Sequence, residues 1–173
     1  SEVQDTDYIV MESLYGGVVH QTREDAAEEL ISMIDSTIKN QGNVVIPSFA
    51  VHKTQELLEI LKTAFEKNKL SQDIKSILDS PLAIRATNIY ENNTTYYDSV
   101  KYNMTDSDLK DLMRFHNLKI TRTHKQSLKL AIKDKSVFIA GSGMAEGGRV
   151  IRHLKTHLPK GNNSVIFVGY QAE

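Results

Sequence analysis

The sequence lacks cysteine and long apolar runs, has little proline, and carries no excess of charge of either sign. The absence of cysteine excludes disulfide scaffolds and thiolate metal sites and favours a cytoplasmic protein. No apolar run approaches the length of a membrane span, and residues 1–5 do not form a signal peptide, so no membrane partner is expected. The formal net charge of -1 gives no support for nonspecific nucleic-acid binding through a strongly basic surface. Any contact with nucleic acid must therefore be local.

What the sequence does contain is typical of a globular α/β protein. The 173 residues predict a single domain over residues 1–173, with 40% hydrophobic and 25% charged residues. Short β-branched runs alternate with amphipathic helices, which predicts a Rossmann-like, mostly parallel sheet flanked by helices. Strands are predicted at residues 8–11, 43–46, 74–78, 118–121, 137–140 and 165–168. Helices are predicted at residues 23–39 after an N-cap at Thr22, through Leu57 to Phe65, after Ser80 and Pro81, and over 126–132. Residues 92–117 form a polar excursion with one predicted helix at 107–116.

A strand, a glycine-rich loop and a helix follow one another over residues 136–157. Four glycines between Gly141 and Gly148 remove the Cβ atoms that would keep a ligand from the backbone, and the next helix turns free N–H groups to the same place. Arg149 adds a planar positive group suited to phosphate. Local sequence favours a phosphate cradle and a plain tight turn about equally. The glycine spacing is one residue too long for the usual dinucleotide fingerprint.

Four loops follow predicted strands and are expected at the carboxyl edge of the sheet, where ligands of open α/β folds bind. Each carries a serine, and Ser48, Ser80 and Ser142 are candidates either for phosphate binding or for helix capping. Glu12 ends the first predicted strand and is expected to point into the same edge, as a catalytic or a structural carboxylate. Asp79 has the same two interpretations, with helix-end hydrogen bonding favoured. No GxSxG elbow surrounds any serine, which argues against a serine hydrolase.

The six histidines do not form a metal-ligand pattern. His153 and His157 lie four residues apart on a predicted helix, but no HExxH motif accompanies them, so solvated side chains are expected. No complete metal site is predicted in the chain. The chain begins and ends abruptly beside predicted strands, which predicts a fragment or an inserted domain.

Several motifs in a fixed order resemble the β-CASP domain of metallo-β-lactamase-type ribonucleases, most closely the prokaryotic relatives of the pre-mRNA 3′-end cleavage endonuclease. They span residues 8 to 173 and lie at residues 8–17 with His20, 45–51 with 54–58, 79–83 with Thr87 and Tyr90, 141–144 with 147–149, His153 with Leu154, and 168–173. The set is highly specific, although each motif alone is weak.

The resemblance implies an α/β domain inserted in a metallo-β-lactamase domain of the same polypeptide, with RNA in the cleft between them. Two zinc ions would be bound by the parent enzyme through ligands outside this chain. Glu12 falls on the family's motif A acid and would orient a histidine beyond Glu173. The resemblance and the loop positions together predict that RNA contacts Ser48, Lys53, Ser80, Ser142, Gly143, Arg149 and His20.

The sequence departs from the family pattern at four positions. The family commonly has Thr at Leu14, Arg at Val18, and Gly-Arg at His52 and Lys53. Lys53 keeps the charge but loses the bidentate fork of arginine, and Val18 loses the charge altogether.

The sequence therefore predicts the RNA-binding portion of a zinc-dependent ribonuclease, inactive when isolated. A stand-alone nucleotide-binding regulatory module and a protein-interaction domain remain as alternatives, and a homodimer of the parent remains open.

Overall fold

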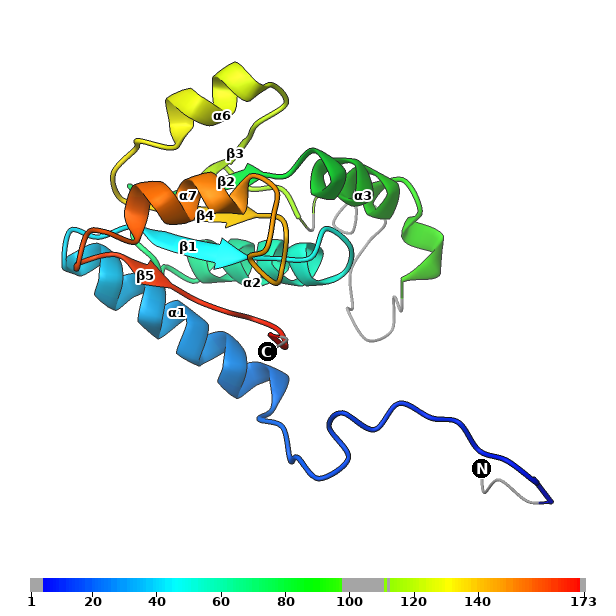
Figure 1. Ribbon diagram of the computed structural model, residues 1–173. Helices are drawn as coiled ribbons and strands as arrows, with labels where there is room; N and C mark the ends of the chain where they lie inside the picture. Colours follow the sequence, from blue (N-terminus) through cyan, green and yellow to red (C-terminus); the bar gives the residue numbers. More distant parts are fainter. Residues whose placement is uncertain (1–4, 98–110, 112, 172–173) are drawn as a thin grey trace.

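The computed structural model describes residues 5–97, 111 and 113–171. Its centre is a five-stranded, all-parallel sheet in the order β3-β2-β4-β1-β5, as Figure 1 shows. The α/β, Rossmann-like fold class is confirmed. The strands are β1 (Val44–Pro47), β2 (Lys75–Asp79), β3 (Leu118–Ile120), β4 (Ser136–Ala140) and β5 (Ser164–Val165). The helices are α1 (Arg23–Lys39), α2 (Lys53–Glu66), α3 (Pro81–Glu91), the 3-10 turn η1 (Thr94–Tyr96), α6 (His124–Leu130) and α7 (Val150–His157).

Local capping chemistry sets where the helices begin. Thr22 caps α1 by accepting a hydrogen bond from the Asp25 backbone N–H at 3.1 Å. Ser80 caps α3 in the same way, with proline in the first helical position. These two starts are as the sequence predicts. The start of α6 is two residues earlier than predicted, because Thr123 and Gln126 form a reciprocal capping box.

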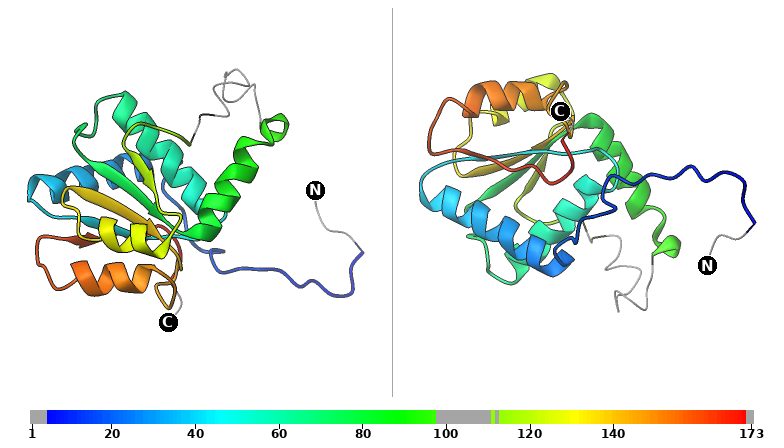
Figure 2. Two further views of the ribbon diagram at one scale, coloured as in Figure 1. Left: turned by 90° about the horizontal axis from the view of Figure 1, so that it is seen from above. Right: turned by 60° about the horizontal axis from the view of Figure 1, so that its bottom comes forward.

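Alternate residues of the strands face two helical layers, as the pleat of a strand requires. Val44 and Ile46 of β1 lie in a core with α1 and α2, and residues of α3 pack against the same core. Val45 of β1 lies instead in a smaller core with Phe138 of β4 and Val150 of α7, against which Leu130 of α6 packs. Helices α1, α2 and α3 therefore cover one face of the sheet, and α6 and α7 cover the other (Figure 2). No described helix is long and apolar enough to cross a membrane.

Two predicted strands differ in the structure. Residues 8–11 are not a strand: they lie in an extended segment that leaves the body of the domain (Figure 1), with Tyr8 89% and Val10 99% exposed. Among the described residues they pair with no strand, and the edge strands of the sheet are β3 and β5. β5 itself has two residues instead of four, since the chain leaves the edge after the Ile166 N–H donates to the Val45 carbonyl. Of the helix predicted at 107–116, residues 107–110 and 112 lie outside the described residues, and the described residues 111 and 113–116 are not helical.

His153 and His157 are buried, which corrects the expectation that they are solvated. They are 0% and 1% exposed, and their rings stack on Phe138 with centroids 4.7 and 4.6 Å away. The shared helix face was predicted correctly. The prediction that this face is open to solvent was wrong, because the Phe138 ring of β4 packs directly against it.

Burial lowers the pKa of His157, although the nearby Ala131 carbonyl acts in the opposite direction. Neither ring nitrogen of His157 has a hydrogen-bond partner of good geometry among the described residues. The folded state therefore favours the neutral ring, and stability is lost as the pH falls below the ordinary histidine value, by at most about 1.4 kcal/mol per pH unit below about 6.5.

His157→Leu should flatten the decline in unfolding free energy between about pH 6.5 and 5, measured by urea titration. An unchanged pH dependence would contradict this assignment.

Candidate functional site

The carboxyl ends of β1 and β4 form a topological switch point. These strands are neighbours, but the chain leaves them on opposite faces of the sheet. From β1 it continues through α2 to β2, and from β4 it continues through α7 to β5. In open parallel sheets the crevice at such a point is the usual ligand site. The Ser48 N–H donates to the Ala140 carbonyl at 2.9 Å, which holds the two strand ends together.

The loop from Gly141 to Gly148 needs glycine at two positions. A Cβ on Gly143 would lie 2.6 Å from the ring of Phe49, so only glycine allows this loop to lie on the aromatic side chain. Gly148 has a φ of 74°, and a Cβ there would lie 2.5 Å from the Gly141 carbonyl oxygen. Part of the loop's hydrogen-bonding capacity is used internally: the Val150 N–H, in the first turn of α7, donates to Gly141 at 2.9 Å. No side chain caps α7.

The three candidate serines come together at this edge but differ in their surroundings. Ser80 caps α3 and Ser48 is 1% exposed, bonded to the Thr54 hydroxyl at 3.0 Å. A Cβ on Gly141 would lie 3.6 Å from the Ser80 hydroxyl and 3.7 Å from the Ser48 carbonyl. Ser142 is half-buried, and its hydroxyl has no hydrogen-bond partner in the part of the chain that the structure describes. Among these serines, Ser142 therefore has the hydroxyl that is free for a ligand.

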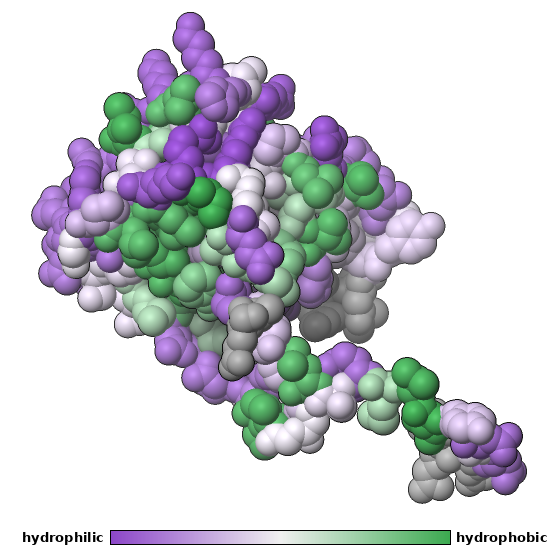
Figure 3. Space-filling model, in the orientation of Figure 1, coloured by the Kyte–Doolittle hydropathy of each residue, from purple (hydrophilic) through white to green (hydrophobic). Residues whose placement is uncertain are grey.

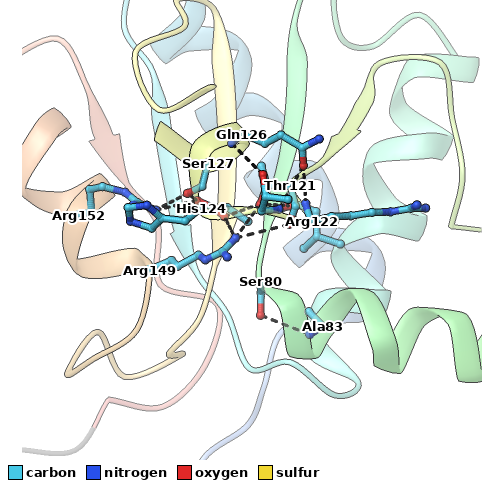
Figure 4. Close-up of polar contacts among 12 residues, drawn as sticks. Ser80, Ala83, Thr121, Arg122, His124, Gln126, Ser127, Arg149 and Arg152 are labelled. Carbon is cyan, nitrogen blue, oxygen red and sulfur yellow. Dashed lines mark hydrogen bonds and ion pairs between the residues drawn. The ribbon is translucent and has the colours of Figure 1, made fainter. Parts of the chain in front are cut away.

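A buried carboxylate cluster lies directly beneath the edge. Asp79, at the end of β2, is 0% exposed and accepts from His153 Nε2 at 2.7 Å and from the Ser127 hydroxyl at 2.5 Å. Arg149 Nη1 lies 2.6 Å from Oδ1 of the same carboxylate, and the Thr121 hydroxyl donates to this oxygen as well. Figure 4 shows the side chains of this cluster converging from β3, α6 and α7, with Ser80 directed toward Ala83. The expectation that Asp79 hydrogen-bonds a helix end is wrong, because Ser80 takes that role.

The cluster has a net positive character. Arg152 Nη2 lies 3.4 Å from Asp79 Oδ2, so two guanidinium groups share one carboxylate. Burial would raise the pKa of Asp79, but hydrogen bonds from His153, Ser127, Thr121 and Arg149 outweigh it and hold that pKa well below its ordinary value. The ionised carboxylate neutralises one of the two arginine charges. The other positive charge remains and acts on the carboxyl edge of the sheet. The two arginine side chains are 21% and 25% exposed, so both reach the solvent.

The remaining predicted site residues lie elsewhere. Lys53 pairs with Glu56 one turn along α2, at 2.9 Å, and His20 packs edge-on against Tyr15. Glu12 is exposed on the extended N-terminal segment, where it accepts from the Leu14 N–H, so it does not point into the sheet edge as expected. His52, where the family commonly has glycine, has a φ of 68°, a left-handed conformation that favours glycine.

Two residues near the edge, Arg152 and Phe49, were not predicted as site residues from the sequence. Arg152 bonds both Ser127 and the His124 ring, whose Nε2 lies 3.1 Å from Nη1. Phe49 is 42% exposed against Gly143, an aromatic surface beside the glycine loop. The i+3 spacing of Arg149 and Arg152 was a visible signal for a shared helix face. Nothing local indicated that α6 supplies the partner of Arg152.

Residues 54–173 match the Beta-Casp domain family. The chain belongs to this family. It is also 31% identical over 169 residues to Ribonuclease TTHA0252 of Thermus thermophilus. The matched region covers 96% of this chain and 38% of that protein. An RNase J-like protein of Methanocaldococcus jannaschii is 30% identical over 175 residues, covering 100% of the chain and 39% of the relative. Endoribonuclease ysh1 of Schizosaccharomyces pombe is 30% identical over 170 residues, covering 96% of the chain and 21% of the relative.

This β-CASP chain spans about two fifths or less of the length of these relatives. Within the described residues, no group of three or more His, Cys, Asp or Glu side chains could hold a metal ion. The Asp79 carboxylate is bonded by His153 Nε2 and two arginines instead, and His153 Nδ1 has no hydrogen-bond partner among the described residues. The described part of the chain therefore offers no site for the two zinc ions, whose ligands the family resemblance places outside this chain.

Proposed function

We propose that this β-CASP chain is the RNA-binding portion of a zinc-dependent ribonuclease that hydrolyses RNA phosphodiester bonds in RNA processing or decay. The observation that carries the proposal is the family match over residues 54–173, which includes the whole glycine loop at the switch point. The names of the relatives, two ribonucleases and an RNase J-like protein, support RNA as the substrate.

The glycine loop and the start of α7 are the proposed phosphate contacts. The Ser142 hydroxyl is free of described partners, whereas Gly143 is buried against the Phe49 ring and its carbonyl accepts a hydrogen bond from Gln171 Nε2 at 3.0 Å. Arg149 and Arg152 add a net positive field from just beneath the edge. Ser48 and Ser80 fix the shape of the neighbouring loops, and Lys53 and His20 are more distant candidates for RNA contact. The field and the loop together suit a polyanion better than a neutral ligand.

The proposal also assigns a role to each of the two domains of the parent protein. The zinc ligands lie outside this chain, in a metallo-β-lactamase domain of the same polypeptide, and RNA lies in the cleft between the two domains. The chain's own residues bind and orient the RNA, and Glu12 orients a histidine of the other domain. The isolated chain is accordingly inactive.

The test compares the full-length protein with the isolated chain on a labelled single-stranded RNA. We expect the full-length protein to cleave the RNA and the chain to bind it without cleavage. Ser142→Asp in the full-length protein should weaken RNA binding about tenfold, because a carboxylate would face phosphate, whereas Ser142→Ala should change it much less. Ser71→Asp, a surface change at the opposite end of β2, is the matched control.

Three results would contradict the proposal. Cleavage by the isolated chain would place the catalytic groups inside it. Tight binding of a free nucleotide instead of RNA would favour a regulatory module. Equal affinities of the Ser142→Asp and Ser71→Asp variants would remove the glycine loop from the interface.

A further inference from the structure

Positive charge is concentrated in about one quarter of the sequence although the net charge is close to zero. Residues 119–160 contain ten of the 21 Lys and Arg residues but only two of the 22 Asp and Glu residues, Asp134 and Glu146. The rest of the chain is correspondingly acidic. Such asymmetry indicates a local surface for a polyanion even where the whole chain is neutral.

The fold places this charge difference on opposite faces of the sheet. Helices α6 and α7 contain four Lys and Arg residues and no Asp or Glu. Helices α1 and α2, on the other face, contain eight Asp and Glu residues against four Lys and Arg. A polyanion is therefore attracted to the α6/α7 face and repelled from the α1/α2 face.

The lysines of α6 point away from the core. Ser127 is 0% exposed and bonds Asp79, and Lys125 and Lys129 lie two residues to either side, which puts both on the opposite, solvent face of the helix. Figure 3 shows hydrophilic side chains gathered over this end of the molecule. In the same basic stretch of the sequence, the other exposed cations are Lys119, Arg122, Lys133, Lys155 and Lys160.

The exposed cations of this face have few anionic partners. In residues 119–160, the ion pairs among described residues join Lys135 to Asp73, and Arg149, Arg152 and His153 to Asp79. The exposed lysines on α6 take part in none of them. A phosphate would therefore not have to displace a carboxylate from these side chains.

The surface adjoins the candidate site through a chain of contacts. Asp79 binds Arg149 beneath the glycine loop and Ser127 in the middle of α6. Arg152 of α7 reaches across to His124 at the start of α6, at 3.1 Å. One carboxylate thus fixes the position of the basic helix relative to the edge where the RNA phosphates are proposed to bind.

We propose that α6 and its flanking residues, from Lys119 to Lys133, form an auxiliary RNA-binding surface that holds the sugar–phosphate backbone outside the cleft. This basic surface rests on the proposed function and extends it, because it gives RNA a path across the α6/α7 face. Residues 119–133 contain no Phe, Tyr or Trp, and the ring of His124 is bonded to Arg152, so the contact is made with phosphates and not by base stacking. The surface is accordingly indifferent to sequence and sensitive to salt.

The test uses the full-length protein and two oligouridylates, one of about 30 nucleotides and one of about 6, a length at the short end of single-stranded binding sites. The variant is Lys125→Gln with Lys129→Gln, since glutamine keeps the helix propensity and removes two charges. The matched control is Lys39→Gln with Lys67→Gln, two exposed lysines on the opposite face. Affinity is measured by fluorescence anisotropy at several salt concentrations, and a gel checks that the RNA is intact.

We expect the α6 variant to bind the long oligonucleotide about tenfold more weakly, with a salt slope smaller by about 1.4, and the short one unchanged. The control variant should resemble the wild type on both. Unchanged binding of the long oligonucleotide, an equal loss on both lengths, or an equal loss in the control would each overturn the auxiliary surface while leaving the proposed function standing. Failure of the wild type to bind either RNA would overturn the proposed function itself, and the surface with it.

Discussion

Asp79→Asn should destabilise the fold by about 3 kcal/mol. The carboxylate is 0% exposed and is held by two arginines, a histidine and two hydroxyl groups. Asparagine keeps the shape but loses the charge, so Arg149 and Arg152 repel each other without compensation. The cost lies at the lower end of the range for a broken buried pair, since both guanidinium groups reach water.

The measurement is a urea titration at pH 7 with a thermal melt, where the midpoint temperature should fall by about 6 to 12 °C. Asp73→Asn is the matched control, because Asp73 also pairs with a basic side chain, Lys135, but at the surface. It should shift the midpoint far less. A loss in Asp79→Asn no larger than in the control would show that the cluster adds nothing to stability.

The pH dependence of the same variant gives a second check. The low pKa of Asp79 in the folded state means that its stabilisation is complete above the ordinary aspartate value and is lost as the pH falls below about 4. The difference between wild type and Asp79→Asn should therefore be constant from about pH 7 to 5 and shrink below about 4. His157 lowers the stability in a different pH range, which begins below about 6.5. The effects of His157 and Asp79 therefore begin at different pH values.

The sequence predicted those parts of the fold that depend on neighbouring residues. The apolar stripe of α1 and its cap at Thr22, and the serine–proline start of α3, are local signals that tertiary packing did not override. The alternation of strands and helices was sufficient for the parallel sheet. The failures at residues 8–11 and at β5 concern pairing, because a β-prone run indicates that a segment is able to pair but not which strand is beside it.

The candidate site was predictable in position but not in chemistry. That Ser48, Ser80 and the glycine loop meet at one edge follows from the parallel sheet alone. The Asp79 cluster joins residues 42 to 74 positions apart, a separation over which no periodicity carries information. Arg149 was expected as a free phosphate ligand, whereas the structure shows it shared between the edge and Asp79. The basic α6/α7 face was not predicted, because the net charge of the whole chain is close to zero and does not show how the charges are distributed.

Glu12→Gln should reduce the turnover of the full-length protein about 10- to 100-fold while leaving RNA affinity nearly unchanged. The family resemblance puts the motif A acid at this position, where it would orient a histidine outside this chain. The structure leaves the Glu12 side chain exposed on the extended segment. A carboxylate that only orients another group acts in the transition state, so its loss should lower kcat and not raise KM.

The control for Glu12 lies on the same segment. Asp7→Asn removes a charge five residues earlier, also from an exposed position, and should leave kcat and KM as they are. Glu12→Asp tests the geometry, since it keeps the charge but shortens the reach, and should give an intermediate kcat. A normal kcat in Glu12→Gln would remove this residue from the mechanism, whereas a rise in KM alone would place it among the RNA contacts. A loss of kcat in Asp7→Asn as well would mean that the whole segment, and not one carboxylate, must be held in place for catalysis.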